Sequence, residues 1–335
     1  MNEFWIGIDV SKRKLDVACL DLRDKIKSRV FSNDSVGHTA LKIWLSERGA
    51  KVETTHICME STGPYSEPPA IVLADASWRV SVVNPARPKA FAETTGVRNK
   101  TDRSDAALLA RFCAKLEPEL WQPPSIEQRK LRALVDRLQA LKDMHLQESN
   151  RLEAVELLGQ DSSISSINDH LAWLATRIAE LEREIDDHID SNPTLKRDAE
   201  LMTSVPGIGN TTVAKLLAHI GDLRRFSSAK ALSAFIGVTP RQRQSGTSVR
   251  GRTMISRAGN AYVRSALFMP ALVALRHNKA IKAFGERLGA NGMARKAAVC
   301  ASMHKLVRVL YGVIRSGKPF DPTRAMPKVD IQVSI

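Results

Sequence analysis

The sequence predicts an α/β domain followed by a mainly α-helical region. Short apolar runs alternate with helical patterns up to residue 116, and apolar residues recur at helical spacing from residue 125 onward. Basic residues are concentrated in the last third: residues 201–335 hold 22 Lys and Arg against 4 Asp and Glu, whereas residues 1–200 hold 28 against 32. This asymmetry indicates a region that binds a polyanion, and a general gain in solubility explains it poorly.

Five strands and four helices are expected in the first domain, residues 1–120. The strands are predicted at 4–10, 15–21, 28–32, 54–60 and 79–84, and the helices near 36–48, 66–76, 85–94 and 102–116. The short turn at 11–14 suggests that the first two strands form an antiparallel hairpin, and the apolar runs at 55–59 and 80–83 suit central strands. Three strands followed by helix, strand, helix, strand and helix is the order of the ribonuclease-H-like fold.

Four carboxylates fall where a strand-built metal site would hold them. Asp9 ends the first apolar run, Glu60 ends the fourth, and Asp102 and Asp105 lie one turn apart at the start of the last helix. An i,i+3 pair shares a helix face, and oxygen ligands from two strands and a helix suit Mg²⁺. Each residue alone fits an ordinary strand end or helix cap. The four carboxylates together lie on the first strand, the fourth strand and the last helix, where the ribonuclease-H-like fold has its acidic residues, and they therefore predict a metal site.

A pair of long helices is expected over residues 121–195, after the break at Trp121-Gln122-Pro123-Pro124. The first helix covers 125–158, and the second carries apolar residues in steps of four and three from Ile167 to Ile189, which is typical of a coiled-coil seam. A polar loop joins them, so we expect an antiparallel hairpin that ends near Pro193. The hairpin acts either as a spacer within the chain or as a contact with another subunit or with RNA.

Two segments of the last region, 196–335, suggest contacts with nucleic acid. Pro-Gly-Ile-Gly at 206–209 resembles a helix-hairpin-helix turn, whose glycines and following helical amides approach a phosphate; a plain helix connector is the alternative. Residues 239–252 predict an Arg-, Ser- and Gly-rich loop, which either only binds nucleic acid or also carries a nucleophilic hydroxyl. Helical patterning returns over 254–316, before a Pro-containing tail. The residues predicted to bind nucleic acid are Lys100, Gly207, Gly209, Lys215, Arg241, Arg243, Arg250 and Arg252.

The cysteines and the hydropathy favour a reduced cytoplasmic environment. Cys19, Cys58, Cys113 and Cys300 are scattered, and no pair has the spacing of a zinc finger or a redox motif. No apolar run reaches the ~20 residues that a membrane span needs, and the first residues do not start a signal peptide. We therefore expect no membrane association.

Five motifs together resemble the DEDD-type insertion-sequence transposases, some of which are bridge-RNA-guided recombinases. They are Gly-Ile-Asp-Val at 7–10, Met-Glu-Ser-Thr-Gly-Pro-Tyr at 59–65, Asn-Lys-Thr-Asp-Arg-Ser-Asp-Ala at 99–106, Pro-Gly-Ile-Gly at 206–209 and Ser-Gly-Thr-Ser-Val-Arg-Gly at 245–251. The resemblance covers essentially the whole chain and implies a RuvC-like domain, a coiled coil and a C-terminal transposase domain. It implies that Asp9, Glu60, Asp102 and Asp105 hold Mg²⁺ and that Ser245 is the nucleophile, rather than Thr247 or Ser248.

The same resemblance implies a reaction and its partners. Strand exchange through a covalent phosphoserine would insert, excise or invert DNA in a bacterial cell, with the target and donor duplexes chosen by pairing to a structured non-coding guide (bridge) RNA. A tetramer is implied, in which the acidic site of one subunit meets the serine of another. A serine hydroxyl is a weak nucleophile until its proton is removed and the phosphate charge is offset, and Mg²⁺ with arginines near Ser245 suits both tasks.

Two other functions stay open on the sequence. A RuvC-like metal-dependent DNA junction nuclease would use the four carboxylates alone and direct water at the phosphate, without a covalent intermediate. A non-catalytic RNA-binding scaffold would use only the basic region. A tyrosine recombinase is disfavoured, because the three tyrosines are Tyr65, Tyr262 and Tyr311, and Tyr262 lies within a helical pattern.

Overall fold

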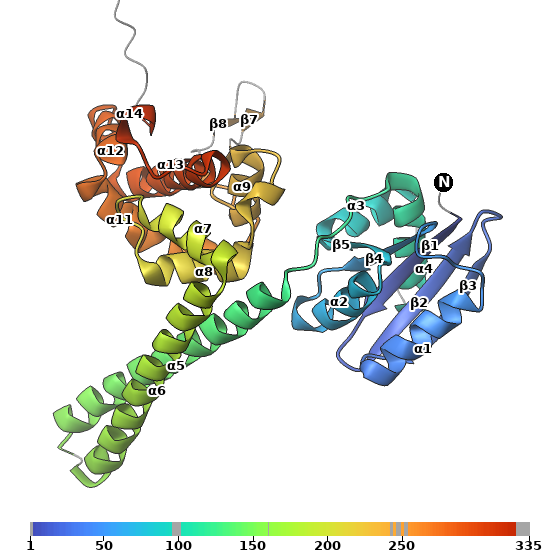
Figure 1. Ribbon diagram of the computed structural model, residues 1–335, viewed down its shortest axis with the longest axis horizontal. Helices are drawn as coiled ribbons and strands as arrows, with labels where there is room; N and C mark the ends of the chain where they lie inside the picture. The colour runs from blue at the N-terminus through green and yellow to red at the C-terminus, as the bar shows by residue number, and fades with distance from the viewer. Residues whose placement is uncertain are drawn as a thin grey trace, which may run out of the picture. The chain divides into compact units, whose positions relative to one another are not determined.

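The computed structural model describes residues 3–95, 102–159, 161–241, 244–245, 249–250 and 254–325. The chain divides into two compact units, residues 1–123 and 124–335 (Figure 1). The predicted division into three domains, with limits at 120 and 195, stays a prediction.

A five-stranded mixed sheet forms the centre of the first unit, in the order β3-β2-β1-β4-β5. The strands β1 (Phe4–Val10), β2 (Lys14–Asp21) and β3 (Ile26–Ser32) are antiparallel neighbours, whereas β4 (Thr55–Glu60) and β5 (Arg79–Val83) continue the sheet in parallel from β1. All five predicted strands are confirmed, and their ends differ from the prediction by two residues at most. A mixed sheet with this strand order is consistent with the predicted ribonuclease-H-like fold.

Helices cover both faces of this sheet (Figure 1). On one face, α1 (Ser35–Ser46) and α2 (Glu67–Asp75) bury Leu41, Trp44 and Leu73 against alternate residues of β1 and β2. On the other face lie α3 (Ala86–Thr95) and α4 (Asp102–Leu116), whose Phe91 and Phe112 rings meet edge to face at 5.7 Å. With both faces covered, β4 is buried along its length except at Glu60, the half-buried last residue.

The second unit begins with two long helices that pack against each other as an antiparallel pair (Figure 1). α5 (Ile126–Leu157) starts at Ser125, whose hydroxyl caps the helix by accepting from the Gln128 amide at 3.2 Å. α6 (Ile164–Ser191) buries Ile167, Leu174, Ile185 and Ile189, which belong to the predicted apolar seam. The two predicted helices are therefore present, and a coiled-coil geometry between them stays a prediction.

All the remaining α-helices except the short last one, Pro322–Ala325, contribute to one apolar core together with parts of α5 and α6. Among the described residues, α13 alone has the length and apolarity of a membrane span, and half of that stretch is buried inside the unit. Packing of its Met303, Leu306 and Leu310 in the core accounts for this apolarity. The helices are α7 (Pro193–Thr203), α8 (Asn210–Ile220), α9 (Ala229–Ile236), α10 (Ala261–Ala266), α11 (Phe268–His277), α12 (Lys279–Ala290), α13 (Arg295–Ser316) and α14 (Pro322–Ala325).

Two expectations for the last region are wrong in part. Residues 239–252, expected to be a loop, contribute short strands: β6 (Pro240–Arg241) pairs with β9 (Met254–Ile255), and β7 (Gln244–Ser245) pairs with β8 (Val249–Arg250). Helical structure resumes at Ala261 and not at residue 254. A strand of two residues shows no alternation in sequence, so only the backbone pairing reveals it.

Candidate active site

Asp9 and Glu60 lie at one end of two parallel strands. β1 and β4 are neighbours with Ile8 opposite Met59, so the next positions in the register are Asp9 and Glu60. Side chains alternate between the faces of a strand. Ile8 and Met59 pack in the core under α1 and α2, whereas Cys58 packs against α4. Asp9 and Glu60 therefore lie on the α4 face of the sheet.

Gly7 lets α4 lie directly on β1. A Cβ atom at Gly7 would stand 2.0 Å from the carbonyl oxygen of Ala106 and 2.4 Å from the amide nitrogen of Ala110. Further along the helix, the Cys113 Sγ donates to the His56 carbonyl at 3.6 Å. The helix thus runs back toward the start of β4, and its first turn, with Asp102 and Asp105, lies at the strand ends that carry Asp9 and Glu60. We call Asp9, Glu60 and this first turn the carboxylate edge.

The four predicted metal ligands thus lie at the same end of the sheet, where β1 and β4 end and α4 begins. The side chains of Asp9, Glu60 and Asp105 are half-buried, and that of Asp102 lies outside the described part of the structure. Among the described side chains, no group of three or more His, Cys, Asp or Glu residues is arranged to hold a metal ion. An all-carboxylate donor set matches the oxygen preference of Mg²⁺, and the four-ligand site stays a prediction.

Sequence reasoning missed two charged residues on the same face of the sheet. Asp16 of β2 is directly opposite Asp9 in the antiparallel ladder. It is 7% exposed, and its Oδ2 lies 3.1 Å from the Nζ of Lys14. The signal was available in the sequence, because a charged residue within an apolar strand is seldom buried without a partner. The partner strand and the register were needed to place it beside Asp9.

The predicted nucleophile lies in a short hairpin whose stem is well anchored. Ser245 of β7 pairs with Val249 of β8. We call residues 239–256 the serine loop. Its stem is closed by the Arg264 guanidinium, which donates to the carbonyls of Ile236 and Arg257 at 3.1 and 3.3 Å, and by the Ser256 amide, which donates to the Thr239 carbonyl at 2.8 Å. The stem therefore fixes both ends of the loop that carries Ser245.

Several predicted site residues lie wholly or partly outside the described part of the chain. Arg241 of β6 is described and exposed. For the others, Ser245 and Arg250 are described by backbone alone, and Lys100, Arg243 and Arg252 are outside the described residues. Their predicted contacts with nucleic acid, and the chemistry of Ser245, stay predictions.

The two glycines of the Pro206-Gly207-Ile208-Gly209 turn differ in their surroundings. Gly207 has a φ of +103°, and a Cβ there would lie 2.9 Å from both the Ala274 side chain and the Pro270 carbonyl. Close packing on α11 is therefore sufficient to require this glycine. Gly209 caps α8, and a Cβ at this position would meet open space. A phosphate can approach the amides of α8 at Gly209, and both binding predictions remain untested.

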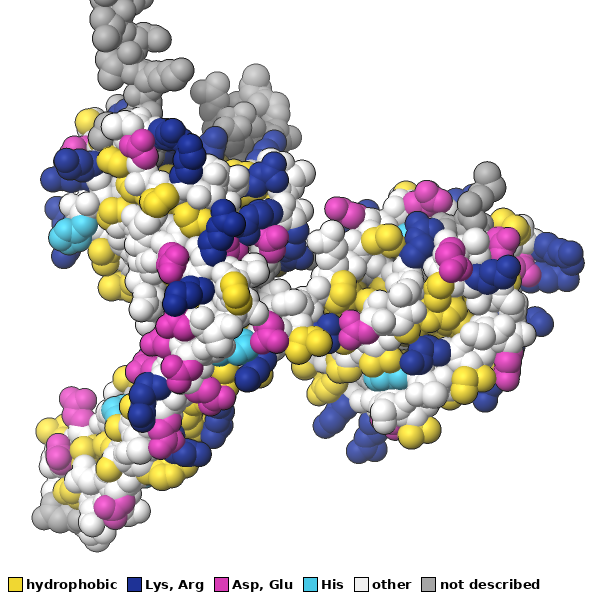
Figure 2. Space-filling model, viewed as in Figure 1, with side chains coloured by type: hydrophobic (Ala, Val, Ile, Leu, Met, Phe, Trp, Pro, Cys, Tyr) yellow, Lys and Arg dark blue, Asp and Glu magenta, His cyan; other side chains and the backbone are white. Residues whose placement is uncertain are grey.

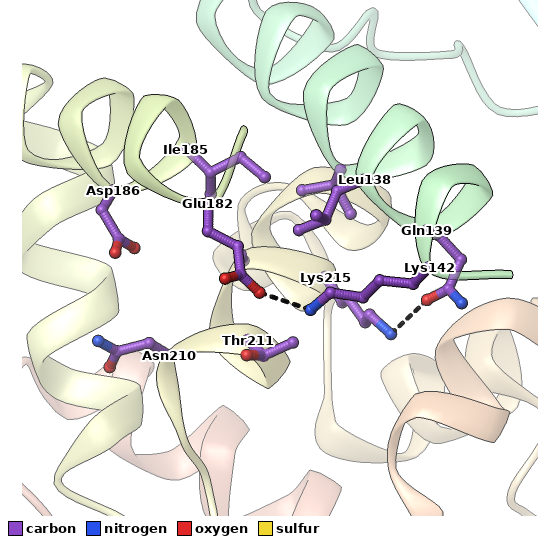
Figure 3. Close-up of a pocket in the computed structure, with 11 residues that line it drawn as sticks. Leu138, Gln139, Lys142, Glu182, Ile185, Asp186, Asn210, Thr211 and Lys215 are labelled. Carbon is purple, nitrogen blue, oxygen red and sulfur yellow. Dashed lines mark hydrogen bonds and ion pairs between the residues drawn. The ribbon is translucent and has the colours of Figure 1, made fainter. Parts of the chain in front are cut away.

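Lys215 lies in a pocket of about 240 Å³ between α5, α6 and α8 (Figure 3). Its Nζ donates to the Gln139 Oε1 at 2.7 Å, and the neighbouring Lys142 Nζ lies 2.6 Å from the Glu182 Oε1. Burial, and then the charge of Lys142, lower the pKa of Lys215. Both cations have partners in the pocket, and because an ammonium group has three N–H donors, the bond to Gln139 leaves Lys215 with donors for the predicted phosphate contact.

A basic surface follows the C-terminal helices of the second unit. α13 carries five Lys and Arg and no acidic residue, and dark-blue side chains are spread over this part of the unit in Figure 2. Burial, and then the charges of Arg308 and Arg287, lower the pKa of Lys305. Cations from α12 and α13 therefore repel one another, and a polyanion bound here would relieve that repulsion.

Comparisons with known proteins give one consistent result. A family model for the DEDD transposase of IS110 elements matches residues 6–158, and the model described as "Transposase IS116/IS110/IS902 family" matches residues 199–286. A pilin gene-inverting protein of Moraxella bovis is 36% identical over 322 residues, which cover 96% of this chain and 98% of that protein. A transposase for insertion sequence element IS1111A of Coxiella burnetii is 28% identical over 226 residues, which cover 58% of this chain and 62% of that transposase.

Proposed function

This chain belongs to the DEDD-type insertion-sequence transposases, and we propose that it is an RNA-guided recombinase that cleaves and rejoins DNA through Ser245. Members of this family are enzymes that act on DNA. The observation that carries the proposal is the meeting of Asp9, Glu60 and the first turn of α4 at one edge of the sheet. The similarity to a gene-inverting protein over nearly the whole chain supports strand exchange as the outcome.

Asp9, Glu60, Asp102 and Asp105 are the residues that would hold Mg²⁺. When bound, the ion supplies electrostatic stabilisation to the scissile phosphate. The carboxylate edge is a suitable place for such an ion, because its donors are all oxygen atoms and come from rigid elements. The exposed Arg241 at the stem, with Arg243, Arg250 and Arg252 of the serine loop, would offset further charge on the phosphate.

In the proposed reaction, the Ser245 Oγ attacks a phosphodiester phosphorus. An Oγ–P bond forms, the P–O bond to the adjacent nucleotide breaks, and the departing hydroxyl oxygen receives a proton. The serine proton passes to a base or to water at the site. The phosphoserine diester keeps the energy of the broken bond, so a hydroxyl end of a second strand can displace the serine and complete the exchange without ATP.

The selection of sites and the assembly are parts of the same proposal. A structured guide RNA would pair with the target and donor duplexes, and the basic helices of the second unit provide a surface for a nucleic-acid backbone. A tetramer would bring the serine of one subunit to the carboxylate edge of another. The carboxylates and the serine occupy separate units of the chain, which is compatible with a composite site of this kind.

The covalent step is tested with Ser245→Ala and, as a matched control in the same loop, Ser248→Ala. Labelled DNA is incubated with protein, guide RNA and Mg²⁺, and denaturing electrophoresis then separates free DNA from a protein–DNA adduct. We expect an adduct with wild type and with Ser248→Ala, and none with Ser245→Ala, which should still bind DNA. Cleavage by Ser245→Ala without an adduct in the wild type would favour the metal-dependent junction nuclease instead.

The composite site is tested by mixing two inactive proteins. Asp9→Ala lacks a carboxylate ligand and Ser245→Ala lacks the nucleophile, so each should be inactive alone. If one site takes its residues from two subunits, the mixture should recover part of the wild-type activity, since some sites will combine an intact carboxylate edge with an intact serine. No recovery in mixed oligomers verified by mass would exclude the shared site.

A further inference from the structure

An ion pair with a buried carboxylate and a partly exposed ammonium lies on the sheet beside the carboxylate edge. In the ladder between β1 and β2, Asp16 is opposite Asp9. Directly opposite residues on antiparallel strands have Cβ atoms about 4.5–5.5 Å apart and share one face of the sheet. Ala18 and Leu20 of the same strand pack against α4, which places Asp16, and Lys14 two residues earlier, on that face too.

The pair is asymmetric in its exposure. The side chain of Asp16 is 10% exposed and that of Lys14 is 44% exposed, with 3.1 Å between the Lys14 Nζ and the Asp16 Oδ2. Like charges on directly opposite residues repel, so Lys14 compensates an acidic residue that would otherwise oppose Asp9 without a countercharge. Ion pairs contribute little net stability whether they are exposed or buried, so fold stability alone gives little reason for this pair.

We propose that Lys14 and Asp16 act as a charge-balancing pair that sets the divalent-cation affinity of the carboxylate edge. The inference rests on the proposed function, because it takes Asp9 to be a cation ligand. Asp16 is a positioning residue in this scheme: it faces Asp9 across the ladder and holds the Lys14 ammonium in place. Lys14 limits the negative charge next to Asp9, and Asp16 prevents the lysine from repelling the cation.

The proposal predicts effects of opposite sign for the two partners. Asp16→Asn keeps the size of the side chain but removes a negative charge from beside Lys14 and Asp9, which should weaken Mg²⁺ binding. Lys14→Met keeps the length of the stem but leaves Asp16 uncompensated, which should strengthen Mg²⁺ binding. A unit charge about 6 Å from a divalent ion changes its affinity by about tenfold at the dielectric constant of water. The double variant, Lys14→Met with Asp16→Asn, should return to within about threefold of wild type, since the net charge is restored.

Binding is measured without DNA, so that the result does not depend on catalysis. The melting temperature of the full-length protein is recorded over a Mg²⁺ titration, because a ligand that binds the native state raises the melting temperature by an amount that grows with the logarithm of the ratio of ligand concentration to dissociation constant. The control is Asp24→Asn, which breaks the ion pair with Arg111 at 2.8 Å. That pair lies at the opposite end of the ladder, beyond the pairing of Phe4 with Asp21, so the Mg²⁺ dependence should stay as in wild type.

The outcomes separate the inference from the proposed function. Opposite shifts for Lys14→Met and Asp16→Asn support the inference, and if Asp16→Asn does not fold, a stronger Mg²⁺ response of Lys14→Met supports it alone. Equal shifts of the same sign would overturn it in favour of a structural role. Unchanged binding in both variants, with binding lost in Asp9→Asn, would overturn it and leave the proposed function standing. A wild-type protein that does not respond to Mg²⁺ would overturn both.

Discussion

Replacing Gly7 with alanine should damage both the fold and the site, because α4 leaves no room for a side chain there. The added Cβ would lie 2.0 Å from the Ala106 carbonyl oxygen, 2.4 Å from the Ala110 amide nitrogen and 2.9 Å from the Leu109 Cβ. Two of these atoms are backbone, so the helix itself must move by about 1 Å to restore ordinary contacts. Overpacking of this kind costs about 3 kcal/mol, which corresponds to a fall of about 10 °C in melting temperature for a unit of this size.

The activity of Gly7→Ala should fall further than its stability explains. The helix carries Asp102 and Asp105 in its first turn, and a displacement of about 1 Å at a catalytic group can reduce a rate about 100-fold. The assay combines thermal unfolding with DNA cleavage measured well below the melting temperature. Gly49→Ala is the control: a Cβ there meets no atom within 4 Å, although its φ of +79° disfavours alanine, so it should lose about 1 kcal/mol and keep its cleavage rate. A Gly7→Ala protein with wild-type melting and cleavage would refute direct packing of α4 on β1.

Three further predictions test other parts of the molecule. Asp105→Ala should abolish cleavage with little change in melting temperature, because it removes a proposed metal ligand that is half-buried and belongs to none of the apolar core clusters; full activity would exclude a four-carboxylate site. Arg241→Ala should reduce the slope of log affinity against log salt by about 0.9 for each phosphate that the arginine neutralises, whereas Lys196→Ala, which removes the partner of Asp190 on α6, should not. Burial, and then Arg79, lower the pKa of His56 to about 4. Because the unfolded imidazole takes up its proton near pH 6.5, stability should be lost as the pH falls from 6.5 toward 4, by up to about 3 kcal/mol. His56→Gln should flatten this dependence in melting curves, and an equal slope in both proteins would contradict it.

The sheet and the carboxylate positions were predictable because they depend on local pattern. Buried strands appear as short apolar runs, so Asp9 and Glu60 could be recognised as strand ends and Asp105 as part of a helical first turn. The ends of all five strands and of the helices around them were close to those observed, since turn residues interrupt the pattern clearly.

Features that depend on pairing between distant segments could not be predicted. The position of Asp16 beside Asp9 depends on the register of the β1–β2 ladder. A slip of one residue in this register would place Asp16 on the opposite face of the sheet. Gly207 looked like a phosphate-binding glycine, and only the position of α11 reveals the close packing that also requires it. Likewise, the partner of Lys215 is Gln139, 76 residues earlier in the chain.

The hydrogen bonds that close the stem of the serine loop determine which substitutions the loop can accept. The bonds from Arg264 and from the Ser256 amide end on backbone carbonyls, at Ile236, Arg257 and Thr239. Carbonyls are present whatever residue occupies a position, so the frame does not depend on the side chains between its two ends. We expect loops from related proteins, or randomised libraries that keep Ser245, to be grafted onto this stem without loss of folding. Such exchange would allow DNA preference to be engineered independently of the scaffold.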